Sequence, residues 1–286
     1  MKERTKLIYK VAVNCIIFAV CAGGLTTLTH MLCSRYILHE HGRPEFLSTS
    51  LILYSCADKI LMALGYYLLG RKIPVKNPVL RSLIYIGLHW ISNFLPQFMG
   101  LAFADGPIAS IAFRMTDLAC DTLTLIVSGV ILGMLYRKEP CKELRKADQR
   151  TAGKAIAVSA ILFPVFIMAA DQFMAFAHRP FSSVGAMQVS DQAMLPFFVN
   201  FYSWFLLSGA FICVFYILTE YNDNGSWLRF ALKYSLLLWT PVVMIMVLFG
   251  TDFIATSVYA LIFIVCILII CFVANKILSS GSKDRN

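Results

Sequence analysis

The chain has 286 residues, of which 59% are hydrophobic and only 14% are charged, and its formal net charge is +9. Its mean hydropathy is +0.72, whereas a soluble domain carries about 25% charged residues to cover its surface. This composition argues against a soluble protein.

Apolar stretches of about 20 residues recur along the whole chain, and a helix of that length crosses the hydrocarbon core of a bilayer. The stretches do not alternate polar and apolar residues, as the strands of a membrane β-barrel do. We predict an all-α, polytopic membrane protein that forms one integral membrane domain, 1–286, with eight transmembrane helices. The predicted spans lie near 8–32, 48–70, 82–103, 108–136, 154–177, 197–219, 228–250 and 253–275.

Basic residues predict the orientation of these spans. They cluster at the N-terminus, between the second and third spans, in the segment 137–154, and around the seventh and eighth spans. In the loops of the opposite side the only basic residues are Arg35, Arg43 and Arg179. Short loops rich in Lys and Arg stay in the cytoplasm. We therefore predict a multi-pass protein of the cytoplasmic (inner) membrane with both termini cytoplasmic. The positive charge therefore serves to orient the spans and lies next to the lipid bilayer. We predict the bilayer as a partner and no nucleic-acid partner.

The first outer loop contains His39-Glu40-His41. Imidazole and carboxylate groups are suitable ligands for a divalent metal. An H-x-H pair alone is not a metal signature, and a solvated loop explains it. We therefore predict no metal and no cofactor, and keep His39 and His41 only as a minor metal-ligand alternative.

Charged residues also occur inside the predicted spans, where each costs about 2.5–3.5 kcal/mol by insertion scales. Asp58 and Lys59 lie in the middle of the second span. The third span carries a stripe of polar residues at helical spacing, with His89 near its middle. Such residues face the interior of a bundle or water rather than lipid.

The fourth span has the most regular polar stripe. Its members recur at steps of three and four residues, which places them on one helix face. They are Ser110, Arg114, Asp117, Asp121, Thr124 and Ser128.

In this stripe Arg114 can pair with Asp117, which lies one turn away. Lys59 is then the candidate cation for Asp121, if the second and fourth helices face each other. Two cations and three carboxylates leave one excess negative charge or one proton, which favours proton or cation handling. We therefore assign an ion, ligand or proton site to Asp58, Lys59, His89, Arg114, Asp117 and Asp121. A purely structural ion-pair network is the alternative.

Polar residues continue in the sixth span with Asn200, Ser203, Trp204 and Ser208. Residues 260–274 of the eighth span contain nothing more polar than cysteine, so we expect this span to face lipid along much of its length. The cysteines form no C-x-x-C pair, which favours a packing role over a zinc site or a disulfide framework.

Catalytic motifs are absent: the chain has no HExxH, no GxSxG and no P-loop. No residue set argues for an enzyme.

Two segments resemble a known family. ALGYYLLGRKIPV at 63–75 looks like the end of the second span, and TLIVSGVILGMLYRK at 124–138 looks like the close of the fourth span, in bacterial membrane-associated sensory (MASE-type) domains. Those domains precede histidine kinases and diguanylate cyclases. The resemblance implies an eight-helix module with both termini in the cytoplasm, and a sensory role.

Three functions follow as hypotheses. The first is a membrane protein that binds a small solute or ion at its intramembrane charges, for transport or ligand sensing. The second is a signalling or regulatory module that acts on a cytoplasmic protein partner through 137–154. The third is a structural or assembly role, in which the charges only fix helix packing.

Overall fold

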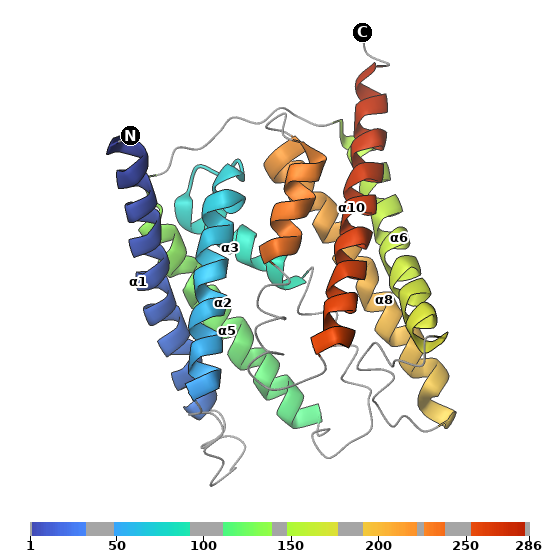
Figure 1. The fold of residues 1–286 in the computed structure, drawn as a ribbon, viewed down its shortest axis with the longest axis horizontal. Helices are drawn as coiled ribbons and strands as arrows, with labels where there is room; N and C mark the ends of the chain where they lie inside the picture. The colour runs from blue at the N-terminus through green and yellow to red at the C-terminus, as the bar shows by residue number, and fades with distance from the viewer. Residues whose placement is uncertain are drawn as a thin grey trace. The chain divides into compact units, whose positions relative to one another are not determined.

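A computed structural model describes residues 2–32, 49–91, 111–138, 148–176, 191–221, 226–237 and 253–283. All regular elements within these residues are helices, and no strand occurs among them (Figure 1). Each of the eight predicted spans contains helix in its described part. The predicted all-α class is therefore confirmed.

The chain forms two compact units. Unit 1 holds α1, α2, the 3-10 turn η3, most of α3, and α5. These elements span Lys2–Leu32, Thr49–Leu68, Gly70–Lys72, Pro78–His89 and Ile111–Leu135.

Unit 2 holds α6, α8, the π-helical turn η5, a helix at 227–237, and α10. Their bounds, apart from the helix at 227–237, are Gln149–Phe176, Asp191–Tyr216, Ile217–Tyr221 and Phe253–Lys283. The organisation as one integral membrane domain stays a prediction.

Five helices within the described residues are long and apolar enough to cross a membrane. They are Thr5–Thr29, Leu118–Leu135, Gln149–Ala170, Tyr202–Tyr221 and Ala260–Ser280. Large apolar side chains on these helices are exposed, among them Val20 at 66%, Ile161 at 61% and Leu261 at 62%. Such exposure is unfavourable in water but neutral against lipid tails. These features support a helical membrane protein, while the count of eight spans and the side of each terminus stay predictions.

Several helices continue beyond the apolar stretch that predicted them. α6 begins at Gln149 rather than 154, α8 begins at Asp191 rather than 197, and α10 runs to Lys283 rather than 275. Hydropathy marks only the apolar part of a helix, whereas backbone hydrogen bonds and caps decide where it ends. At the start of α6, Asp148 Oδ2 accepts hydrogen bonds from Thr151 N at 3.1 Å and Thr151 Oγ1 at 2.8 Å. Part of the predicted polar loop 137–154 is thus the capped first turn of α6.

In unit 1, α1 packs along α2 and also contacts α5 (Figure 1). The buried face of α1 carries Cys15, Phe18, Ala19 and Ala22, which recur at helical spacing and are at most 6% exposed. Three of these four side chains are small, so the axes of α1 and α2 can approach closely.

α3 and α5 meet across two glycines that lie one turn apart on α5. A Cβ atom on Gly133 would lie 2.6 Å from Val79 Cα and 2.7 Å from Ser82 Oγ. Ser82 Oγ also lies 2.5 Å from the carbonyl oxygen of Gly129. This is the small-xxx-small packing that membrane helices use in place of a hydrophobic driving force.

In unit 2, α8 packs against α6 at another glycine. The space in front of Gly209 is filled by the carbonyl group of Ser159 and the Cβ atom of Phe163. The rings of Phe163, Phe205 and Phe263 then join α6, α8 and α10, with centroids 5.6 to 6.4 Å apart. The core of unit 2 therefore lies between these three helices.

The expectation that the eighth span faces lipid along much of its length is wrong for one face of α10. Ile267, Ile270 and Ala274 are fully buried there, and Cys271 is 1% exposed. Only the opposite face, with Leu261 at 62% and Val265 at 46%, is open. The apolar stretch 260–274 gives no polar stripe to mark the inner side of α10, so this part of the sequence cannot show which face packs.

Candidate functional site

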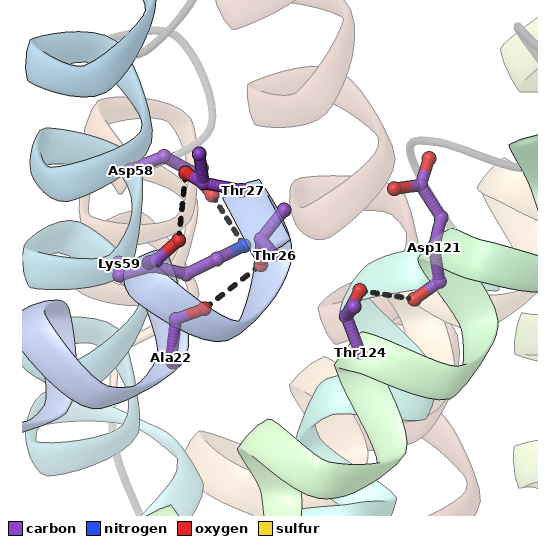
Figure 2. Close-up of polar contacts among 8 residues, drawn as sticks. Ala22, Thr26, Thr27, Asp58, Lys59, Asp121 and Thr124 are labelled. Carbon is purple, nitrogen blue, oxygen red and sulfur yellow. Dashed lines mark hydrogen bonds and ion pairs between the residues drawn. The ribbon is translucent and has the colours of Figure 1, made fainter. Parts of the chain in front are cut away.

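Asp58 and Lys59 form an ion pair in the middle of α2 (Figure 2). The distance from Lys59 Nζ to Asp58 Oδ2 is 2.9 Å, and the side chains are 9% and 24% exposed, respectively. Successive residues point about 100° apart on a helix, so the long lysine side chain has to bend back toward its neighbour. The two charges are therefore neutralised within one helix.

The face of α1 next to this pair is made of small and hydroxyl residues. Figure 2 shows Thr26 and Thr27 of α1 beside the pair, and their hydroxyls donate to the carbonyls of Ala22 at 2.9 Å and Gly23 at 3.0 Å. These bonds are local to α1, so the two threonines line the pair without bridging the helices.

Ser55 lies one turn before Asp58 on α2 and faces Gly23 of α1. Its hydroxyl oxygen would be 3.6 Å from a Cβ atom on Gly23. The hydroxyl oxygen is buried and has no hydrogen-bond partner among the described residues. A buried polar atom of this kind adds hydrogen-bonding capacity close to the ion pair.

Asp121 lies on α5 of the same unit. Thr124 Oγ1 donates to its backbone carbonyl at 2.9 Å. Figure 2 shows the Asp121 carboxylate on α5, apart from the Asp58–Lys59 pair. Lys59 thus pairs with its own neighbour, and the structure does not bring it to Asp121.

The described part of the α5 stripe faces inward, as its spacing indicates. Thr124 is 3% exposed and Ser128 is fully buried, whereas Leu123 and Ile126 on the other faces are 57% and 50% exposed. Arg114 and Asp117 are residues of α5, but the structure describes only their backbone.

His89 is the last residue of α3 and is half-buried, on the face that also carries the buried Ser82 and Tyr85. It belongs to unit 2, whereas the Asp58–Lys59 pair belongs to unit 1. His39 and His41 lie outside the described residues. Within the part of the chain that is described, no group of three or more His, Cys, Asp or Glu residues could hold a metal ion.

A second charged pair, which the sequence did not suggest, lies in unit 2. Glu220 is fully buried in the π-helical turn at the end of α8. Its Oε1 atom lies 3.1 Å from Nζ of Lys233, whose side chain is 25% exposed. π-Helical turns interrupt α-helices mostly at sites of function. Glu220 and Lys233 lie 13 residues apart, so helical spacing in the sequence gives no signal for this pair.

Aromatic rings surround this second pair. Tyr216, Phe230 and Tyr234 form a packed cluster, with Tyr216–Phe230 centroids 5.4 Å apart and Phe230–Tyr234 centroids 5.5 Å apart. The Tyr216 hydroxyl donates to Asn275 Oδ1 of α10 at 2.9 Å. Gly209, Cys213, Tyr216 and Glu220 recur at helical spacing and are all buried, so they form a buried seam along α8 and η5.

Removing the Tyr216 hydroxyl tests this seam. We expect Tyr216→Phe to lower the free energy of unfolding by about 1 kcal/mol, because the hydrogen bond to Asn275 is lost and the ring contacts remain. The readout is the melting temperature of purified protein in detergent. Tyr9→Phe is the matched control, since Tyr9 is 72% exposed. Equal melting temperatures for both variants would contradict a contribution from this bond.

Most described cysteines act as small buried or lipid-facing groups. The free thiols are Cys15, Cys21, Cys56, Cys213, Cys266 and Cys271. Cys120 differs because it is disulfide-bonded. The sequence spacing of the cysteines gives no sign of this single bond, since disulfides depend on proximity in the fold and not on a C-x-x-C spacing.

Comparison with protein-family models, with curated proteins and with solved structures finds no match for this chain. The resemblance to MASE-type sensory domains stays an expectation from topology and from the two quoted segments.

Proposed function

We propose that unit 1 binds a small cation, or a small solute with a cationic group, at its intramembrane charges, as part of transport or ligand sensing. The observation that carries the proposal is the Asp58–Lys59 pair. Its lysine is almost fully buried in the middle of α2, and its partner is the preceding residue.

This geometry favours a binding role over a structural one. A structural ion pair stabilises a bundle by joining two helices, and removing it separates them. The Asp58–Lys59 pair joins two residues of α2, and within the described side chains it makes no ionic link to α1 or α5. Charged residues in this position are costly, and they mark ion or substrate pathways in membrane proteins.

The residues around the pair suit exchange of one cation for another. Asp58 is the more exposed partner, at 24% against 9% for Lys59. An incoming cation can therefore reach the carboxylate and replace the ammonium group. The buried hydroxyl of Ser55 supplies an oxygen atom on the same helix. Asp121 on α5 provides a second carboxylate within unit 1.

The test uses the full chain, purified and reconstituted in liposomes, with Na⁺ and protons as probes. We expect Asp58→Asn and Asp121→Asn each to reduce ²²Na⁺ uptake or proton flux by about tenfold or more, since each removes a carboxylate that the cation would bind. If the role is sensing, the wild type shows a Na⁺-dependent rise in melting temperature that these variants lose.

Asp148→Asn is the matched control. It makes the same change in charge at the cap of α6, and asparagine caps a helix as well as aspartate does. The proposal is contradicted if the two site variants keep both wild-type flux and the wild-type Na⁺ response. A wild type that shows neither response excludes small cations as the ligand.

A further inference from the structure

The turn between α2 and α3 is held by a buried arginine. Arg81 is 1% exposed. Its Nε donates to the carbonyl of Val75 at 2.9 Å, and its Nη1 lies 3.4 Å from the carbonyl of Arg71. Burying a guanidinium group is costly unless its donors are bonded. Arg81 therefore acts as a positioning residue that orders the turn from inside the protein.

In this ordered turn, the Arg71 side chain packs on an aromatic ring. The Arg71 guanidinium carbon lies 4.1 Å from the centre of the Tyr67 ring, which is the geometry of a cation–π contact. The Tyr67 and Tyr136 ring centroids are 6.3 Å apart, and Tyr136 lies in the turn directly after α5, just before the exposed Arg137. Arg71 and Arg137 thus flank one tyrosine pair. We call Tyr67, Arg71, Tyr136 and Arg137 the Arg–Tyr cluster.

Further tyrosines make the base of this cluster rigid. Tyr66 packs against Tyr85 and Tyr136, with ring centroids 5.5 and 5.3 Å apart. The Tyr85 hydroxyl donates to the carbonyl of Met62 at 3.1 Å. These tyrosine contacts therefore hold α2, α3 and the end of α5 together beside the two arginines.

This end of unit 1 is strongly positive. Its exposed or half-buried basic residues come from the start of α1, the end of α2, the following turn and the end of α5. They are Lys6, Lys10, Arg71, Lys72, Lys76, Arg137 and Lys138. The carboxylates among the described side chains of unit 1 are Asp58 and Asp121, which both lie in mid-helix. The potential at this end therefore favours an anion.

We propose that the Arg–Tyr cluster binds the phosphodiester headgroup of an anionic phospholipid, such as phosphatidylglycerol or cardiolipin. Arginine presents donors that match phosphate oxygens. A tyrosine at the end of a membrane helix, such as the half-buried Tyr67, lies at headgroup depth, with the ring in the apolar region and the hydroxyl group in the polar region. Basic sites between helix ends bind such headgroups. The proposal does not depend on the function proposed for Asp58 and Lys59.

A loop whose basic residues only orient the spans would explain the positive charge at this end of unit 1. It would not explain the contacts that Arg81 and Arg71 make. The positive-inside rule needs only the number of Lys and Arg residues near a span end. It does not require a fully buried Arg81 that bonds the turn carbonyls, or a guanidinium group stacked on a tyrosine. These contacts order the arginine side chain before a ligand arrives, which lowers the entropic cost of binding.

The test compares lipid binding by the full chain in detergent, measured by native mass spectrometry with phosphatidylglycerol and with phosphatidylcholine. We expect the double variant Arg71→Gln/Arg137→Gln to bind phosphatidylglycerol about tenfold more weakly, with phosphatidylcholine binding unchanged. The single variant Arg71→Lys keeps the charge but loses the planar guanidinium group, so we expect an intermediate affinity. A normal elution profile confirms that each variant is folded.

The control is Arg150→Gln/Lys154→Gln, which removes two exposed basic residues from the start of α6 in unit 2. We expect this control to bind phosphatidylglycerol as the wild type does. The proposal is overturned if the control loses affinity equally, or if the Arg71→Gln/Arg137→Gln variant keeps wild-type affinity. Displacement of phosphatidylglycerol by inorganic phosphate at equal concentration would also overturn it, since the site would then bind soluble phosphate rather than lipid.

Discussion

Replacing Gly133 by alanine is expected to destabilise unit 1 by about 3 kcal/mol, the upper end of the usual cost of overpacking. The new methyl group would lie 2.6 Å from Val79 Cα and 2.9 Å from the carbonyl oxygen of Pro78. Both are backbone atoms of α3, so relief requires the two helices to separate and not merely a side chain to rotate. The measurement is the unfolding free energy or melting temperature of the purified full chain in detergent.

Gly24→Ala on α1 is the matched control, because no atom lies within 4 Å of the position its Cβ would take. Alanine is also a better helix former than glycine by about 1 kcal/mol. We therefore expect this control to be neutral or slightly stabilising. If Gly133→Ala is as stable as Gly24→Ala, the close approach of α3 and α5 is refuted.

Replacing Lys233 by methionine is expected to cost about 3 kcal/mol, because the fully buried Glu220 loses the ammonium group 3.1 Å from its Oε1 atom. Breaking a buried pair costs about 3–5 kcal/mol, and we take the low end because the Lys233 side chain is 25% exposed. Replacing both partners removes the uncompensated charge. The double variant Glu220→Gln/Lys233→Met should therefore recover most of the stability.

A double-mutant cycle measures this coupling directly. It requires the unfolding free energies of the wild type, Glu220→Gln, Lys233→Met and the double variant. Lys154→Met, at an exposed position on α6, controls for the loss of a surface lysine. Strictly additive effects of the two changes would show that Glu220 and Lys233 do not interact in the folded protein.

The sequence predicted the helical class, because runs of apolar residues long enough to cross a bilayer are compatible with few other structures. It also predicted the inward face of α5, since Thr124 and Ser128 follow a regular polar period and are both buried. Helix ends were less predictable. At Gln149 and Lys283 the chain stays helical in polar sequence, which hydropathy cannot show.

Partners across the fold were harder to predict. The spacing of Lys59 and Asp121 left their pairing open, and the structure pairs Lys59 with Asp58. Glu220 and Lys233 lie 13 residues apart on different helices, and no periodicity links them. The α3–α5 contact depends on Gly129 and Gly133, whose lack of side chains gives no signal in an analysis of polar and charged residues.

The prediction that α2 spans the membrane gives the Asp58–Lys59 pair a role in how α2 would be inserted during synthesis. A lone charge at the centre of an inserting segment costs about 2.5–3.5 kcal/mol. Because the two charges contact each other at 2.9 Å within α2, the segment carries its own counter-ion. We expect it to leave the translocon nearly neutral, before α1 or α5 has docked. If the two charges were moved apart along the helix, we expect α2 to insert only once another helix supplies the counter-ion.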